Sequence, residues 1–355
     1  MQEKISMRCF GHFRRYTIIL CIFTLAFAPT VILLRERDRT EIFFFPWKAT
    51  DAVVLHETEV VERNTSSNCT NRNLHYDGYD TRAFGNAVFS DFAMGGPRNN
   101  CSVLLIGMHG TINENANQFP GIVVYLNGEV HAHKVSNRHF YLGPQSVDVP
   151  ENISFLLYYV SFAFLELGQP SFIQRKEDPR SEFLLYVSSR CLDHRESAFD
   201  ALSNIGEVHA TGKCHGKTSN YKQVKFESIH NWMDSYSAYE EYRFALAMEN
   251  TKQAGYVTEK ILNAFIGGAV PIYWGTTDVF DIFNRNAFIY FDPENPNDAL
   301  DRVRYLEYNV TAYKEMRQHP IFATGALQKY FSLADNIADG ALKRKIRHFL
   351  GIHDP

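Results

Sequence analysis

The chain has no excess of basic residues and few cysteines. Its 355 residues include 36 Lys and Arg against 40 Asp and Glu, and the formal net charge is -4. Proteins that bind nucleic acid usually carry a clear positive surplus, so no nucleic-acid partner is predicted. The six cysteines include no C-x-x-C pair, and the sequence has no D-x-D motif, so no metal site is predicted. Internal repeats and low-complexity tracts are also absent.

Apolar residues, by contrast, are abundant. Hydrophobic residues make up 45% of the chain and charged residues 21%, a composition that supports a large buried core and argues against disorder. At roughly 100–200 residues per domain, the length predicts two domains.

The longest uncharged apolar run covers residues 16–34. A helix of about 20 apolar residues can span the hydrocarbon core of a bilayer, so this run predicts an N-terminal transmembrane helix. The helix would separate a cytosolic tail, residues 1–15, from a short stem, residues 35–40. The short tail and the large body favour a lumenal body, although arginines at positions 35, 37 and 39 follow the run.

A cleavable signal peptide is the alternative for this run, because Ala26-Phe27-Ala28 resembles a cleavage site. However, Pro29 would directly follow the cut, and the run continues to Leu34, beyond a usual signal core. Both features favour an uncleaved anchor. A second aromatic-rich segment, residues 155–164, is too short to span a bilayer and is assigned to the core or to a binding surface.

Four cysteines follow the predicted anchor, and an even number suits an oxidising lumen. By sequence distance, the simplest pairing joins Cys69 to Cys101 and Cys191 to Cys214, but the sequence does not establish it. Weaker support for a lumenal body comes from N-x-S/T sequons, which begin at Asn64, Asn68, Asn100, Asn152 and Asn309.

The order of apolar segments predicts an α/β fold with two domains facing across a cleft. Strands alternate with helices over short connections, which indicates parallel sheets covered by helices. The first domain is expected over residues 41–172 and the second over residues 173–340, followed by a C-terminal helix or tail, residues 341–355. Strands are expected at 41–47, 102–108, 121–126, 183–188, 243–248, 269–274 and 287–291, and helices at 194–205, 256–266 and 297–308.

The segment around residue 250 has the features of an anion site. A strand ends at Glu249-Asn250, a Gly-containing loop follows, and a helix is expected to begin near Tyr256. The free N–H groups and positive dipole end of such a helix attract phosphate. Lys260 would lie on the same helix face as Tyr256 and add a positive charge, and Glu259 could accept hydrogen bonds from sugar hydroxyls. The alternative is that these charges only solvate a surface.

Residues 242–275 resemble the signature of the α1,3-fucosyltransferase family. That signature reads Y-[KR]-F-x-L-x-F-E-N-[ST], then Y-[VI]-T-E-K, then a strand with V-P-I-x-x-G. The chain matches it with YRFALAMENT at 242–251, YVTEK at 256–260 and VPIYWG at 270–275. Met248 replaces the usual Phe, which is a tolerated packing change. Weaker similarity extends from about Glu41 to the C-terminus.

The resemblance implies two Rossmann-like domains in the glycosyltransferase B arrangement, with GDP-fucose held mainly by the C-terminal one. It implies that Arg195 and Lys260 contact the diphosphate of the donor. It also places Asn250, Tyr256 and Glu259 around the ribose and fucose, and it counts Glu249 among the donor-binding residues. No obligatory metal cofactor is expected, and stimulation by Mn²⁺ is left open. A single-pass Golgi membrane protein with a lumenal catalytic body is the expected location.

In this family the catalytic base is a Glu that follows a Gly in the N-terminal domain, and Glu129 in Asn127-Gly128-Glu129 occupies that place. Most members continue with Asn or Ser, whereas this chain continues with Val130-His131. The implied reaction is inverting transfer of L-fucose from GDP-β-L-fucose to a GlcNAc hydroxyl of a glycan in α1,3-linkage, with Glu129 accepting the proton.

Two other functions remain open from the sequence. One is transfer from a different GDP-sugar on the same fold. The other is a non-catalytic, membrane-tethered protein that binds glycans. The acceptor also stays open between a Lewis-type antenna and the core GlcNAc of an N-glycan.

Overall fold

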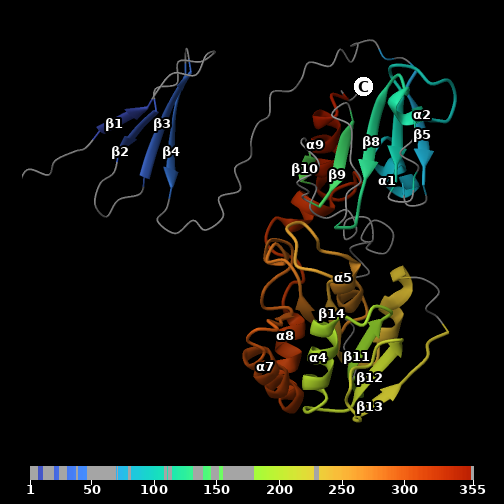
Figure 1. Cartoon of the computed structure of the whole chain (residues 1–355), viewed down its shortest axis with the longest axis vertical. Coiled ribbons are helices and arrows are strands. Elements are labelled where there is room, and N and C mark those ends of the chain that lie inside the picture. Colours follow the sequence, from blue (N-terminus) through green and yellow to red (C-terminus); the bar gives the residue numbers. More distant parts are fainter. Residues whose placement is uncertain are drawn as a thin grey trace, which may run out of the picture. The chain divides into compact units, whose positions relative to one another are not determined.

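The computed structural model describes residues 7–10, 20–23, 30–36, 39–45, 69, 71–78, 81–107, 110, 114–130, 139–144, 152–154, 180–227 and 232–352. The chain divides into two compact units, residues 1–61 and residues 62–355 (Figure 1). The first unit holds an antiparallel sheet in the order β1-β2-β3-β4. Its strands are β1 (Met7–Phe10), β2 (Leu20–Phe23), β3 (Thr30–Glu36) and β4 (Arg39–Phe45).

The transmembrane helix predicted over residues 16–34 is not supported. The parts of that run that the structure describes belong to the strands β2 and β3, and the rest lies outside the described residues. Among the described residues, no helix combines the length and the apolar character that crossing a bilayer requires. A run rich in Ile, Leu, Val and Thr suits an extended strand as well as a helix, because β-branched side chains favour both strand packing and burial.

The second unit contains two parallel six-stranded sheets. The first has the order β10-β9-β8-β7-β5-β6. Its strands are β5 (Asn73–Asp77), β6 (Ala93–Met94), β7 (Val103–Ile106), β8 (Ile122–Leu126), β9 (Phe140–Gly143) and β10 (Asn152–Ser154). In the described residues between these strands lie the helices α1 (Thr81–Val88) and α2 (Glu114–Asn117). The strands predicted over 102–108 and 121–126 are therefore confirmed as β7 and β8.

The second sheet has the order β13-β12-β11-β14-β15-β16. Its strands are β11 (Glu182–Ser188), β12 (Val208–Gly212), β13 (Tyr221–Gln223), β14 (Tyr242–Met248), β15 (Val270–Trp274) and β16 (Ile289–Tyr290). The helices are α4 (Asp193–Leu202), α5 (Glu259–Ile266), α6 (Val279–Ile282), α7 (Asn297–Tyr308) and α8 (Val310–Gln318), with a 3-10 helix η2 (Trp232–Tyr239). Parallel sheets with helices confirm the predicted α/β class.

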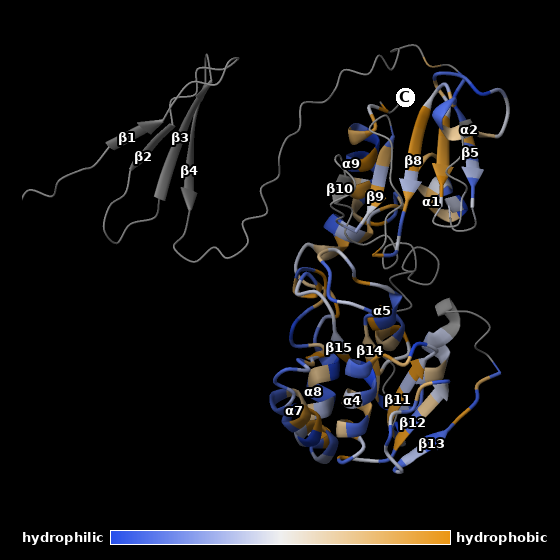
Figure 2. Ribbon diagram, viewed as in Figure 1, coloured by the Kyte–Doolittle hydropathy of each residue, from blue (hydrophilic) through white to orange (hydrophobic). Residues whose placement is uncertain are grey.

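Burial explains why these segments form strands. The central strands of both sheets are apolar along nearly their whole length, as expected where helices cover both faces. Figure 2 shows this for β8 and β11, and Leu184 and Val124 are completely buried. The helix α7 shows the other pattern: its buried residues are Ala299, Val303 and Leu306, one stripe at helical spacing.

The C-terminal helix α9 (Ala341–Phe349) returns to the first sheet of this unit (Figure 1). Leu342 and Ile346 of α9 pack in the same core cluster as Leu74 of β5 and Phe84 of α1. Residues more than 250 positions apart in the sequence therefore complete one hydrophobic core.

Candidate active site

A cavity of about 530 Å³ opens where the strands of the second sheet end. Its volume lies in the range of small-molecule sites, and the carboxyl edge of a parallel sheet is where open α/β folds bind ligands. The wall comes from the ends of β11, β12 and β14, from α4 and α5, and from the loop after β8. The lining residues on which the chemistry depends are Glu129, Arg195, Asn250, Tyr256, Glu259 and Lys260.

Arg195 is a buried cation on this wall. Its side chain projects from the first turn of α4, and the residue is only 3% exposed. Its Nη2 donates to the backbone O of Met248 at 2.5 Å and to Oδ1 of Asn250 at 2.9 Å. Burial lowers the pKa of Arg195, but a guanidinium stays charged at any physiological pH. Among the described residues no carboxylate forms an ion pair with it. A buried, unpaired cation on a cavity wall favours an anionic ligand.

Glu249 lies beneath the cavity instead of on its wall. The residue is completely buried. Its carboxylate accepts hydrogen bonds from the backbone N–H of Thr258 at 2.7 Å and from the Thr258 hydroxyl at 2.9 Å. Tyr273 donates from the other side at 3.5 Å. Glu249, which the family resemblance placed at the donor, therefore holds the chain in place just before α5.

This contact also corrects the expected start of the helix. α5 begins at Glu259, with Thr258 as its extended N-cap residue, and not near Tyr256. The N–H of Thr258 is captured by the Glu249 carboxylate, so the chain stays extended until the next residue. Tyr256 therefore lies in the loop, and the prediction that it shares a helix face with Lys260 is wrong.

Lys260 and Glu259 form the first turn of α5. The Lys260 Nζ lies 2.9 Å from Oγ1 of Thr258, 3.3 Å from Oε2 of Glu249 and 3.7 Å from Oε1 of Glu259. Burial disfavours the ammonium, but the two carboxylates outweigh it and raise the pKa of Lys260. Burial raises the pKa of Glu259, against the opposing effect of Lys260. The positive end of α5 thus carries a fixed ammonium at the cavity.

Glu129 reaches the cavity from the loop after β8. Asn127 shapes this loop: its Oδ1 accepts from the N–H of Glu129 at 3.0 Å, and its Nδ2 donates to the carbonyl of Glu129 at 2.8 Å. The buried Tyr141 hydroxyl of β9 accepts from the same Nδ2 at 2.9 Å. Glu129 therefore stands on a turn braced by the sheet, which the sequence pattern Asn-Gly-Glu alone did not reveal.

Tyr256 and Asn250, the remaining predicted residues, form hydrogen bonds with each other and with Glu129. The Tyr256 hydroxyl donates to Oε2 of Glu129 at 3.2 Å and accepts from Nδ2 of Asn250 at 3.1 Å. Of the seven residues predicted for the site, six line the cavity, and Glu249 supports it from below.

Part of the cavity wall was not predicted from the sequence. Ser188 ends β11, and Ser189 and Arg190 follow it, where the rule for the carboxyl ends of parallel strands could have found them. Phe226 and Ser235 also line the cavity. They lie outside the regular strands and α-helices, where no sequence periodicity marks them.

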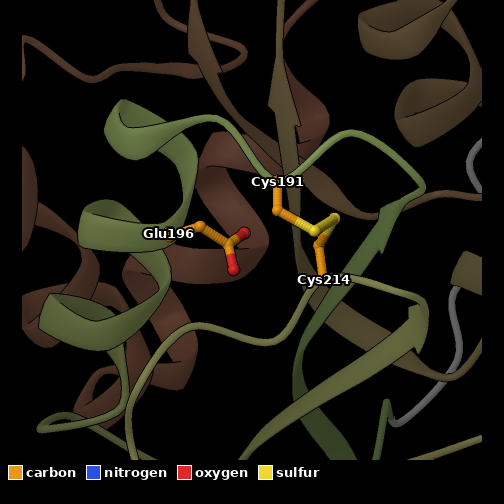
Figure 3. Close-up of side chains that lie close together, drawn as sticks. All are labelled: Cys191, Glu196 and Cys214. Carbon is orange, nitrogen blue, oxygen red and sulfur yellow. A yellow bond between two sulfur atoms is a disulfide. The ribbon is translucent and has the colours of Figure 1, made fainter.

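Within the described part of the chain, one group of potential metal ligands stands out, formed by Cys191, Glu196 and Cys214 (Figure 3). The two sulfurs form a disulfide, so neither is a thiolate that could bind metal. The Glu196 carboxylate already accepts from the N–H of Gly216 at 2.8 Å and from the hydroxyl of Tyr186 at 2.9 Å. The group is therefore a structural link. Cys69 and Cys101 form the other disulfide, and both bonds match the pairing favoured by sequence distance.

The domain that carries most of this cavity is similar to known proteins. Residues 178–319 match the family described as Glycosyltransferase family 10 (fucosyltransferase) C-term. The chain is 33% identical over 123 residues to an alpha-(1,3)-fucosyltransferase of Helicobacter pylori, which covers 34% of the chain and 24% of that relative. It is 39% identical over 122 residues to an alpha-(1,4)-fucosyltransferase of Arabidopsis thaliana, which covers 31% of the chain and 30% of that relative. The chain thus spans less than a third of the length of these relatives.

A solved structure of an alpha1,3-fucosyltransferase shares the fold. It superposes with a TM-score of 0.54 at 19% identity, over 81% of this chain and 91% of that one. The family match, the sequence relatives and the shared fold all point to similarity with fucosyltransferases. Residues 178–319 are therefore similar to the C-terminal domain of glycosyltransferase family 10, the fucosyltransferase family.

Proposed function

We propose that this protein is an inverting glycosyltransferase that moves L-fucose from GDP-β-L-fucose to a GlcNAc hydroxyl of a glycan in α1,3-linkage. The observation that carries the proposal is the pair of cations on the cavity wall, in a domain that matches the family 10 model. Arg195 is buried and has no carboxylate partner among the residues that the structure describes, and Lys260 stands at the positive end of α5. Guanidinium and ammonium groups beside a helix N-terminus suit a nucleoside diphosphate.

The proposed chemistry is a single in-line displacement. Glu129 accepts the proton of the acceptor hydroxyl as its oxygen attacks C1 of fucose, and the bond from C1 to the diphosphate breaks. Negative charge then grows on the departing diphosphate, where Arg195, Lys260 and the start of α5 stabilise it. In this assignment residues 173–340 bind the donor, and residues 41–172 bind the acceptor.

Replacing both cations tests donor binding. We expect Arg195→Ala/Lys260→Ala to weaken GDP affinity by about 100-fold or more, since a hydrogen bond to a charged group contributes about 1.5–3 kcal/mol. Isothermal titration with GDP measures this. Arg304→Ala/Lys314→Ala removes one arginine and one lysine from the exposed surface and should bind GDP like the wild type. Unchanged affinity in the first variant would refute the proposed diphosphate site.

Replacing the base tests the chemistry. Glu129→Gln should abolish transfer from radiolabelled GDP-fucose, because the amide cannot accept the proton, while GDP affinity stays within about threefold. Full activity in this variant would exclude Glu129 as the base. Greater thermal protection by GDP-mannose than by GDP-fucose would favour another sugar donor. GDP and glycan binding without turnover in the wild type would favour a non-catalytic glycan-binding protein.

The relatives include an alpha-(1,4)-fucosyltransferase as well as an alpha-(1,3) one, so they do not decide the linkage. The proposed α1,3-linkage therefore rests on the signature at 242–275. A panel of GlcNAc-terminated antennae and core N-glycans, with linkage analysis of the product, decides both linkage and acceptor. No obligatory metal enters the proposal, since the two cations offset the charge of the leaving group. Full activity in EDTA supports this, and adding Mn²⁺ tests stimulation.

The membrane location is a proposal that rests on the uncharged run at residues 16–34 alone. We place the chain in the Golgi membrane as a single-pass protein with a lumenal body. Expression of the full chain in cells, followed by alkaline carbonate extraction, tests the anchor. Recovery of all the protein in the carbonate supernatant would contradict it.

A further inference from the structure

We propose that Tyr256 is the residue that positions Glu129, at the end of a hydrogen-bond chain that begins at Arg195. The inference rests on the proposed function and deepens it, because it links the diphosphate site to the base. The chain runs from Arg195 to Asn250 at 2.9 Å, from Asn250 to Tyr256 at 3.1 Å, and from Tyr256 to Glu129 at 3.2 Å.

The direction of every bond in this chain follows from the chemistry of its first member. A guanidinium only donates hydrogen bonds, so the side-chain oxygen of Asn250 must face Arg195. The NH₂ group of Asn250 then faces Tyr256 and donates to the phenolic oxygen. With that lone pair occupied, the single Tyr256 proton points to the carboxylate of Glu129.

The environment of Tyr256 keeps this proton in place. The residue is only 1% exposed. Burial first, then the charges of Glu249 and Glu129, raise the pKa of the Tyr256 hydroxyl, so it remains a donor throughout the physiological range. A buried phenol that has one partner on each side has little freedom to reorient.

The bond also fixes Glu129 from a distant part of the chain. Tyr256 precedes α5 beside the second sheet, whereas Glu129 follows β8 of the first sheet, 127 positions earlier. A second hydrogen bond joins the same two loops: Nε2 of Gln253 donates to the backbone O of Val130 at 3.5 Å. Tyr256 occupies Oε2 of Glu129, and among the described residues nothing bonds to Oε1, which leaves that oxygen to take the proton of the acceptor.

The test is Tyr256→Phe in the full chain, which removes only the hydroxyl. We expect kcat for fucosyl transfer to fall about 10- to 100-fold, while the Kd for GDP changes by less than about threefold. Tyr308→Phe is the matched control, because Tyr308 is an exposed tyrosine outside the cavity, and it should leave both constants unchanged. Wild-type kcat in Tyr256→Phe would overturn the inference.

A double-mutant cycle distinguishes positioning from a general structural effect. In the Glu129→Asp background the carboxylate is one methylene shorter and loses its bond to Tyr256. Adding Tyr256→Phe should then lower kcat by less than about threefold. An equal loss in both backgrounds would show that Tyr256 acts independently of Glu129.

Two further outcomes are decisive. If Tyr256→Phe does not fold, Asn250→Ala replaces it: this variant breaks the chain one step earlier and should also lower kcat, and unchanged kcat would overturn the inference. If the wild type binds GDP but transfers no fucose to any acceptor, the proposed function fails and takes this inference with it. If the wild type transfers fucose and Tyr256→Phe does so with the same kcat, only this inference fails and the proposed function stands.

Discussion

At the scale of single residues, Glu249 shows how a signature residue can support the cavity without lining it. It is completely buried, and it connects the end of β14 to the start of α5. Its negative charge also faces the ammonium of Lys260 at 3.3 Å. Burying a carboxylate is costly unless it is paired, and here the paired groups are the ones that shape the cavity.

We expect Glu249→Ala to lower the free energy of unfolding by about 3–5 kcal/mol. The change leaves the N–H and hydroxyl of Thr258 without their acceptor and removes a charge that faces Lys260. Urea denaturation followed by far-UV circular dichroism measures the loss. Glu294→Ala removes an exposed carboxylate and should shift stability by no more than about 0.5 kcal/mol. Equal effects of the two variants would contradict the role given to Glu249.

At the scale of elements, the loop between β11 and α4 is held on both sides. Ser188 to Arg190 line the cavity, and the carbonyl of Arg190 accepts from Nη1 of Arg195 at 3.3 Å. Directly after them, Cys191 is joined to Cys214, which follows β12 (Figure 3). The disulfide therefore ties the loop that supports Arg195 to the neighbouring strand.

Removing this disulfide should affect both stability and donor binding. The bond spans 23 residues. For a loop of that length, removing the disulfide lowers the free energy of unfolding by about 3 kcal/mol. We expect Cys191→Ser/Cys214→Ser to lower the melting temperature and to weaken GDP affinity at least about fivefold. Cys69→Ser/Cys101→Ser removes a bond of similar span, 32 residues, between cysteines that do not line the cavity, and should lower stability only. The same GDP affinity in both variants would show that the Cys191–Cys214 disulfide does not support donor binding.

At the scale of the whole unit, the C-terminal helix α9 closes the core of the first sheet. Its buried Arg347 donates to Asp91 through Nη1 at 2.7 Å and through Nη2 at 3.0 Å, and Arg72 donates to the same carboxylate at 2.8 Å. Burial alone would raise the pKa of Asp91, but the bonds and charge of Arg347, with Arg72, lower it.

Asp91→Asn should destabilise the protein by about 3–5 kcal/mol at neutral pH, because it removes the carboxylate charge that pairs with the buried Arg347. Since the folded pKa of Asp91 is lowered, its stabilisation is present above the unfolded pKa of about 3.9 and is lost as pH falls through the lower folded value. The gap between wild type and variant should therefore shrink below about pH 4. Asp335→Asn breaks an exposed pair with Lys343 of α9 and should cost no more than about 1 kcal/mol.

Several elements could be predicted because their patterns are local. The apolar runs at β7, β8, β11, β14 and β15 were recognised as buried strands, and α7 from its apolar stripe. The short strands β6 and β13 escaped prediction, because two or three residues carry no periodicity. The predicted start of α5 is wrong because the side chain of Glu249, the residue that follows β14, accepts a hydrogen bond from the N–H of Thr258.

The sequence by itself determined the family signature, the α/β class and the residues that carry charge at the candidate site. These depend on local order along the chain, where residue types repeat at the spacing of strands and helices. Only the tertiary structure decided that Arg195 is a buried cation on the cavity wall, that Glu249 lies under the cavity, and that Tyr256 contacts Glu129. Burial and hydrogen bonding between residues up to 127 positions apart arise only when the sheets pack, so no local pattern encodes them.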